Sequence, residues 1–84
     1  MAGIDRDRPV HLILNPRSGY GGRKYLLAEL RAECRRWAIE LLVHRTRGPG
    51  DATDYARKLP GQAAAAMVWG GDGTVNEVAQ ALAG

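Results

Sequence analysis

Seven consecutive residues near the end of the chain combine three glycines with a carboxylate, a hydroxyl and an amide. They are Gly70-Gly71-Asp72-Gly73-Thr74-Val75-Asn76. Glycine lets backbone N–H groups approach an anion closely, and a helix that begins there adds the partial positive charge of its first turn. The carboxylate of Asp72 would repel phosphate oxygens unless it acts through Mg²⁺, through a bound water or by fixing the loop. The pattern therefore favours a phosphate-binding loop.

The same loop has a simpler interpretation that needs no ligand. Thr74 and Glu77 match a Thr-x-x-Glu capping box, in which the two side chains satisfy backbone N–H groups at the start of a helix. Capping explains these two residues but not the three glycines and the aspartate, so phosphate binding is the favoured interpretation. Asn76 fits either one.

A second loop, earlier in the chain, also carries groups that bind phosphate. It reads Asn15-Pro16-Arg17-Ser18-Gly19-Tyr20-Gly21-Gly22-Arg23-Lys24. Ser18 and the backbone amides would donate hydrogen bonds, and the neighbouring Arg and Lys side chains would supply counter-charge. Asn-Pro-x-Ser-Gly is also good turn chemistry, so the residues alone leave binding and a simple turn open.

Neither loop matches the common nucleotide-binding signatures. Gly-x-x-x-x-Gly-Lys-Ser/Thr is absent, and Gly71-x-Gly73-x-x-Asn76 lacks the third glycine of the dinucleotide fingerprint. The acidic residue expected about 20 positions after the first loop would be Glu40, which lies inside a predicted strand. His11 and His44 have no second histidine or cysteine at ligand spacing, so no metal-ligand set is predicted.

The elements that must position these loops follow from the hydrophobic pattern. Apolar runs at residues 10–14, 39–43 and 65–69 predict three strands. Residues 23–37 carry apolar side chains at spacings of three and four, which predicts an amphipathic helix after the first strand.

Two shorter helices are predicted after the second and third strands. Asp51 is placed to cap the first of them, and Pro60-Gly61 would stop it. The last helix should bury the residues that recur at i, i+3, i+4 and i+7, namely Val75, Val78, Ala79 and Leu82.

The resulting order, β-α-β-α-β-α, predicts an α/β fold with a parallel sheet and helices on both faces. We expect a three-layer α/β/α arrangement, an incomplete Rossmann-like nucleotide-binding domain. Ligands bind beyond the carboxyl ends of strands in such sheets, so both loops should face one crevice. Thr46 follows the second strand and should point to the same crevice.

Composition narrows the class of protein. Eighty-four residues make one small domain, and the single cysteine, Cys34, excludes an internal disulfide. The N-terminal residues do not form a signal peptide, and the longest apolar run is too short to cross a bilayer. The net charge of +3 is concentrated in the first half of the chain, which favours an anionic ligand or surface there. No nucleic-acid partner is predicted, since no nucleic-acid-binding motif occurs.

Three motifs in register resemble the catalytic domain of the diacylglycerol kinase and sphingosine kinase family, within a superfamily that includes NAD kinase and phosphofructokinases. They are residues 15–19, Thr46 with Gly50-Asp51-Ala52, and residues 70–76. The resemblance implies that residues 9–84 are the N-terminal, ATP-binding part of such a domain, truncated, after a leader at residues 1–8. Relatives are longer, with a second, β-rich domain that supplies the general base, structural Mg²⁺ ligands and the lipid pocket.

The resemblance implies transfer of the ATP γ-phosphoryl group to a lipid hydroxyl, of diacylglycerol or a sphingoid base, with Mg²⁺ as cofactor. Asp72 would be the essential acid. The residues implied in ATP binding are Asn15, Pro16, Arg17, Ser18, Gly19, Thr46, Gly70, Gly71, Asp72, Gly73, Thr74, Val75 and Asn76. Relatives often place histidine where this chain has Asp51, a departure that bears on the contacts on the adenine side.

We also expect a cytoplasmic protein that meets its lipid substrate peripherally at a membrane surface. The 84 residues alone should be inactive, and an exposed apolar sheet edge should lead them to self-associate or to fold poorly. Two other functions remain open at this point: a non-catalytic nucleotide-binding module, and the dinucleotide-binding half of an oxidoreductase.

Overall fold

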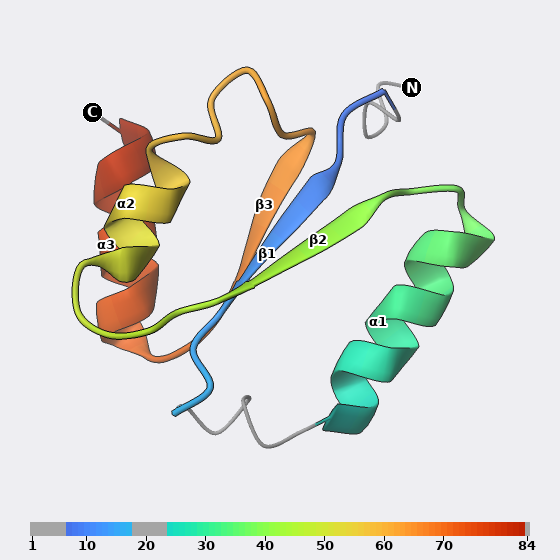
Figure 1. Cartoon of the computed structure of the whole chain (residues 1–84), viewed down its shortest axis with the longest axis horizontal. Helices are drawn as coiled ribbons and strands as arrows, with labels where there is room; N and C mark the ends of the chain where they lie inside the picture. The colour runs from blue at the N-terminus through green and yellow to red at the C-terminus, as the bar shows by residue number, and fades with distance from the viewer. Residues whose placement is uncertain (1–6, 18–23, 84) are drawn as a thin grey trace.

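The computed structural model describes residues 7–17 and 24–83, which form a sheet with helices on both faces (Figure 1). The elements follow in the order β1 (Val10–Leu14), α1 (Lys24–Arg36), β2 (Leu41–Arg45), α2 (Asp51–Ala56), β3 (Ala65–Trp69) and α3 (Asp72–Ala83). The predicted α/β class and the β-α-β-α-β-α order are confirmed. None of the helices in the described ranges is both long and apolar enough to cross a membrane.

The sheet has the strand order β2-β1-β3, and both pairings are parallel. The central strand β1 is buried along its whole length, which explains its nearly continuous apolar sequence. Leu14 pairs with Arg45 of β2 and with Trp69 of β3, so the three strands end at the same level. The loops that follow them therefore meet at one edge of the sheet.

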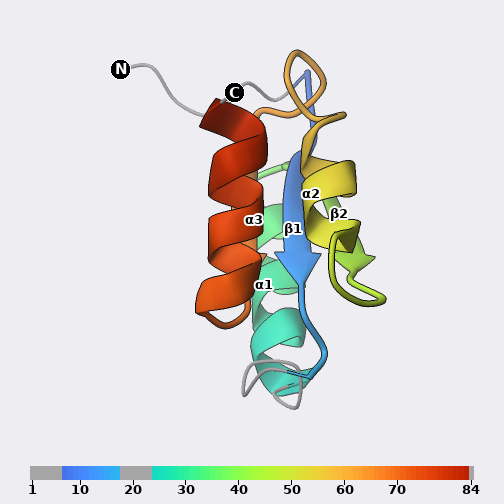
Figure 2. The ribbon, with the colours of Figure 1, turned by 90° about the vertical axis from the view of Figure 1, so that its left-hand side faces the viewer.

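Helices α2 and α3 lie together on one face of the sheet, and α1 lies on the other (Figure 2). On the first face, Ile13 packs in a core with Ala52, Ala56, Leu59 and Val78. Leu12, also fully buried, points to the opposite face, because successive side chains of a strand alternate. Burial on both faces of β1 confirms the predicted three-layer arrangement.

Strand β2 begins two residues later than predicted, at Leu41 rather than Ile39. After the end of helix α1, Ala38 lies in the left-handed region at φ 57°, and the Ile39 N–H donates to the Cys34 carbonyl at 2.8 Å. These are the features of a Schellman cap, which is normally built on glycine. Because the cap takes up Ile39, the strand can begin only after it.

The prediction that Asp51 caps α2 is wrong. The N-cap residue is Gly50, at φ 87°, and Asp51 is the first residue of the helix. A positive φ of this size favours glycine, which explains the residue type at position 50. Helix α2 also ends earlier than predicted, at Ala56, well before Pro60-Gly61.

The predicted capping box is also wrong, because α3 begins at Asp72 and Thr74 already lies inside the helix. The buried face of α3 differs from the predicted one as well. Thr74 and Val78 are buried, whereas Val75 and Leu82 are 47% and 45% exposed. The inward stripe is therefore offset by one residue from the apolar stripe in the sequence.

Candidate functional site

A cavity of about 310 Å³ lies at the carboxyl ends of the strands, where the three loops meet. Each loop contributes to its wall. The lining residues are Asn15 and Arg17 after β1, Thr46, Arg47, Gly48 and Pro49 after β2, Ala52 of α2, and Gly71, Gly73, Thr74 and Glu77 around the start of α3. Three motifs that are far apart in the sequence thus form one site.

Six of the predicted binding residues line this cavity: Asn15, Arg17, Thr46, Gly71, Gly73 and Thr74. Five others do not: Pro16, Gly70, Asp72, Val75 and Asn76. Asp72 is exposed at the first position of α3. Ser18 and Gly19 lie outside the described residues. The assignment of all thirteen residues to ATP stays a prediction.

Asn15 joins the first loop to the glycine loop. Its Nδ2 donates to Thr74 Oγ1 at 3.1 Å, and its Oδ1 accepts from the Arg17 N–H at 2.9 Å. Its backbone N–H donates to the Trp69 carbonyl at 2.8 Å. Asn15 therefore has a positioning role that the resemblance did not indicate, because it fixes Arg17 and Thr74 relative to each other.

The glycines of the second loop differ in what requires them. A Cβ on Gly70 would lie 2.8 Å from Thr74 Cβ, so the fold itself needs glycine there. A Cβ on Gly71 or Gly73 would meet nothing within 4 Å. These two glycines line the cavity, and their lack of side chains keeps the cavity accessible. Packing against the rest of the fold does not require glycine at either position. Two residues that packing does not require to be glycine thus face the space where an anion would sit.

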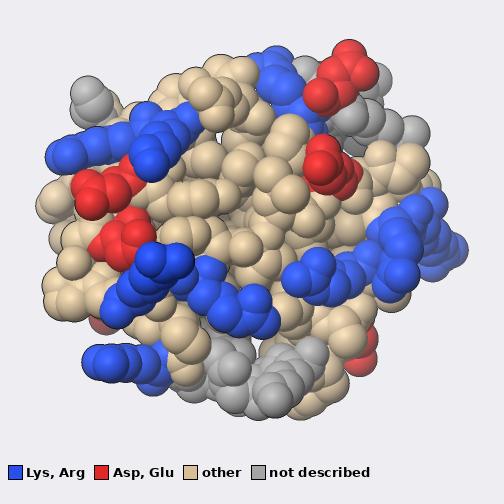
Figure 3. Space-filling view, viewed as in Figure 1, with Lys and Arg blue, Asp and Glu red and all other residues tan. Residues whose placement is uncertain are grey.

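The charge around the cavity suits an anion. Helix α3 begins at its wall and directs the positive end of its dipole there. Arg17 and Arg47 add two positive charges to the lining. In Figure 3, Lys and Arg side chains outnumber acidic ones over α1 and over the lower part of the molecule, where the loops after the strands lie. The arrangement favours a phosphate-bearing ligand.

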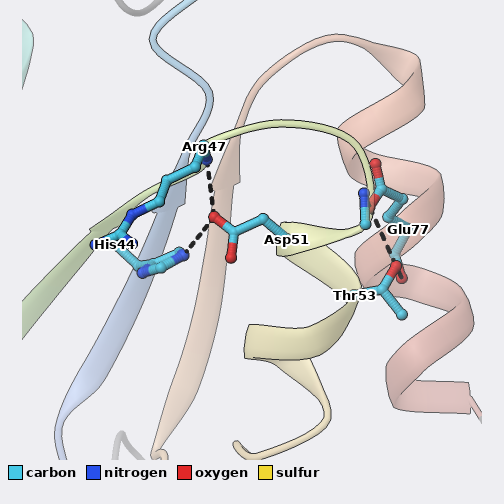
Figure 4. Close-up of polar contacts among 6 residues, drawn as sticks. His44, Arg47, Asp51, Thr53 and Glu77 are labelled. Atoms are coloured by element: carbon cyan, nitrogen blue, oxygen red, sulfur yellow. Dashed lines mark hydrogen bonds and ion pairs between the residues drawn. The ribbon is translucent and has the colours of Figure 1, made fainter.

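Two carboxylates hold the loop after β2, as Figure 4 shows. Asp51 Oδ2 accepts from the Arg47 N–H at 2.8 Å and from His44 Nε2 at 3.0 Å. Glu77 Oε1 accepts from the Gly50 N–H at 2.9 Å and from Thr53 Oγ1 at 3.2 Å. The Arg47 N–H, and after it His44, hold the pKa of Asp51 below its usual value despite some burial.

Sequence reasoning missed both carboxylate contacts. Asp51 lies four residues after Arg47, a local spacing at which an Asp side chain can bond to a preceding backbone group, so this signal was available. Glu77 lies 27 residues from Gly50, and no local pattern points to that contact.

A second set of polar contacts lies between α2 and the sheet. The Tyr55 hydroxyl is 2.6 Å from His11 Nδ1, and the His44 ring stacks on Tyr55 with centroids 4.0 Å apart. Burial lowers the pKa of His11 against the opposing charge of Glu40, and burial raises the pKa of Tyr55. The two histidines, isolated in the sequence, thus both contact one tyrosine. Residues 7–17 and 24–83 contain no cluster of three His, Cys, Asp or Glu able to hold a metal.

A parallel sheet with a glycine loop and a helix start beyond its carboxyl ends places the chain in the Rossmann-like class of α/β proteins. Residues 9–84 match the family model of the diacylglycerol kinase catalytic domain. The chain therefore belongs to that family, as its motifs predicted.

The fold is similar to that of a solved relative. The crystal structure of a candidate diacylglycerol kinase from Bacillus anthracis str. Sterne matches with a TM-score of 0.73 and 34% sequence identity. The match covers 90% of this chain and 26% of that one. The search of curated proteins gave no match.

Proposed function

We propose that this chain is the ATP-binding part of a lipid kinase, which transfers the γ-phosphoryl group of ATP to a lipid hydroxyl. Membership of the family supports a lipid-kinase-type domain. The observation that best supports ATP binding is the cavity itself. Gly71 and Gly73 leave backbone open beside a helix N-terminus although packing does not require glycine at either position.

In this proposal the phosphates of ATP lie over the glycine loop. Backbone N–H groups at the start of α3 donate to them, and Arg17 and Arg47 neutralise their charge. Thr46 lines the opposite side of the cavity. Ser18 and Gly19 would complete the first loop.

In this proposal, a Mg²⁺ ion is held mainly by ATP. Magnesium in phosphoryl-transfer sites usually takes one or two protein carboxylates together with substrate phosphates, and it neutralises charge on the transferred group. Glu77 already accepts two hydrogen bonds, whereas Asp72 is an exposed carboxylate at the start of the same helix. We assign Asp72 the role of holding this ion or an attached water.

The acceptor side of the reaction lies elsewhere in this proposal. Transfer to an alcohol needs a general base and a pocket for the lipid. We propose that residues 9–84 supply the ATP half of the site, after a leader at residues 1–8, and that a further domain supplies the rest. The protein would work in the cytoplasm and meet its lipid peripherally at a membrane surface.

The decisive test is Asp72→Asn in the complete protein, assayed with radiolabelled ATP and diacylglycerol or sphingosine vesicles. We expect phosphoryl transfer to fall by at least about 100-fold with an unchanged circular dichroism spectrum, because metal or water positioning is lost while the loop keeps its shape. The matched control is Asp54→Asn, an exposed residue of α2 outside the cavity lining. Wild-type turnover in Asp72→Asn would contradict the assignment.

Two further outcomes separate the alternatives. Displacement of labelled ATP by NAD(H) at lower concentration than by unlabelled ATP would favour the dinucleotide-binding function. Tight ATP binding by the complete protein, without transfer to either lipid, would favour the non-catalytic module.

A further inference from the structure

One wall of the cavity is a short connection without regular structure. It comprises Arg47, Gly48, Pro49 and Gly50, here called the wall segment, which follow Thr46 in the connection between β2 and α2. Its first three residues line the cavity. The wall segment is exposed, so its position depends on what holds it from behind.

Asp51 holds the start of the wall segment. One carboxylate oxygen, Oδ2, accepts from the Arg47 N–H at 2.8 Å and from His44 Nε2 at 3.0 Å. His44 is itself fixed, because its ring stacks on Tyr55 with an interplanar angle of 9°. Asp51, at the start of α2, thus bonds both to Arg47 of the wall segment and to His44 of β2. These bonds tie the wall segment to both elements.

Glu77 holds the end of the wall segment from the other side (Figure 4). Its Oε1 accepts from the Gly50 N–H at 2.9 Å and from Thr53 Oγ1 at 3.2 Å. Glu77 lies on α3, one turn after Gly73 of the glycine loop. A single carboxylate therefore sets the separation between the wall segment and the helix start that faces it across the cavity.

Both carboxylates lie close to a site for an anion, where a free negative charge would oppose binding. Each is instead engaged by donors: two N–H groups at Asp51, and an N–H and a hydroxyl at Glu77. These hydrogen bonds stabilise the carboxylate charges and order the wall segment before any ligand arrives.

We propose that Asp51 and Glu77 are positioning residues that hold the wall segment in place, so that phosphates enter a preformed cavity. This inference rests on the proposed function, because it takes ATP as the ligand. Order that exists before binding raises affinity, since the ligand need not restrain the loop. Neither carboxylate contacts the nucleotide or its metal.

The test compares alanine with isosteric variants in the complete protein, with ATP affinity measured by calorimetry. Asp51→Ala and Glu77→Ala should each weaken ATP binding about tenfold, the effect of losing one or two hydrogen bonds. Glu77→Gln and Asp51→Asn keep an oxygen that can accept from the Gly50 or Arg47 N–H and should recover most of the affinity. Exposed residues outside the cavity lining, changed in Asp54→Ala and Glu33→Ala, serve as matched controls and should bind ATP normally.

Amide hydrogen exchange without ATP gives a second readout. The alanine variants should exchange faster at Arg47 and Gly50, with unchanged protection in the central strand β1, which also shows that they fold.

Each contrary outcome has a separate meaning. Unchanged affinity in both alanine variants would overturn the positioning role while leaving the proposed function intact. Glu77→Gln as impaired as Glu77→Ala would also overturn it, because a need for the charge indicates a metal ligand. A wild-type protein that binds no ATP would overturn the proposed function and the positioning role with it.

Discussion

Gly70 and Gly71 are neighbours in one loop, yet the structure requires glycine at only one of them. A Cβ at position 70 would lie 2.8 Å from Thr74 Cβ, whereas a Cβ at position 71 would be in open space. We expect Gly70→Ala to lower the free energy of unfolding by about 1–3 kcal/mol, and Gly71→Ala by under about 0.5 kcal/mol.

The same pair separates folding from binding. Gly71→Val should change the free energy of ATP binding more than the free energy of unfolding, since Gly71 lines the cavity. Urea denaturation and ATP calorimetry on the variants measure the two effects. A larger loss of stability in Gly71→Ala than in Gly70→Ala would contradict this division of roles.

His11 makes stability depend on pH. Burial lowers its pKa from 6.5 in the folded state, so the unfolded chain takes up a proton first as the pH falls. The contribution of neutral His11 is present above pH 6.5 and is lost as the pH falls through the folded-state pKa. We expect the free energy of unfolding to decrease as the pH falls below 6.5.

Denaturation of wild type and His11→Gln across this range measures the effect. Glutamine can still bond to the Tyr55 hydroxyl but does not titrate, so the variant should show a smaller slope with pH. Equal slopes would mean that His11 does not control stability in this range.

At the level of elements, the end of α1 carries an unfavourable residue. Ala38 adopts φ 57°, a conformation that costs a residue with a Cβ about 1–2 kcal/mol. Glycine avoids this strain but adds freedom to the unfolded chain, worth about 0.4–1 kcal/mol. Ala38→Gly should therefore raise the free energy of unfolding by about 0.5–1 kcal/mol.

Ala28→Gly is the matched control for this variant, because Ala28 is an exposed residue within α1. Glycine there should lower stability by about 0.5–1 kcal/mol. Thermal and urea denaturation of both variants would show the opposite signs. A loss of stability in Ala38→Gly would argue against the Schellman cap.

The elements themselves were largely predictable, because their signals are local. The strands at residues 10–14 and 65–69 were predicted with the bounds that the structure has. The predicted bounds of the second strand were displaced by two residues, since the cap at Ala38 has no glycine that would indicate it in the sequence. The buried face of α3 was misjudged because its inward stripe begins with Thr74, a polar residue whose hydroxyl accepts from Asn15.

The contacts that shape the candidate site were less predictable. The meeting of the three loops follows from parallel strands, and the sequence predicted it. The contacts that fix the loops were beyond local patterns, because Asn15 reaches Thr74 over 59 positions and Glu77 reaches Gly50 over 27. The predicted capping box involved the same Thr74 and Glu77, whose hydrogen-bond partners lie in other loops and in α2.

At the scale of the whole molecule, three loops form the ATP half of the proposed site, but the sheet that positions them has both of its edges unpaired among the described residues. Within residues 7–17 and 24–83, strands β2 and β3 are both edges of the sheet, with only β1 between them. Leu42 on β2 and Val75 and Leu82 on α3 are 39–47% exposed. Unpaired strand edges and exposed apolar side chains favour association between chains.

We therefore expect a polypeptide of these 84 residues, prepared alone, to self-associate. Light scattering at increasing protein concentration would show a rising mean mass. Leu42→Lys together with Leu82→Lys should reduce the association by placing charges on both surfaces, whereas Glu29→Lys, on the exposed side of α1, should not. A monomer over the whole concentration range would contradict this expectation.

The same polypeptide should not phosphorylate a lipid, even where it binds ATP. Transfer to an alcohol needs a base near the acceptor hydroxyl and exclusion of water. Of the described Asp and Glu residues, only Glu77 lines the cavity, and its Oε1 already accepts from Gly50 and Thr53. Incubation with radiolabelled ATP, Mg²⁺ and diacylglycerol vesicles should yield no labelled lipid, whereas the complete protein should label it under the same conditions. Lipid labelling by a monomeric 84-residue chain would place the base within these residues and contradict the assignment of the acceptor side to a further domain.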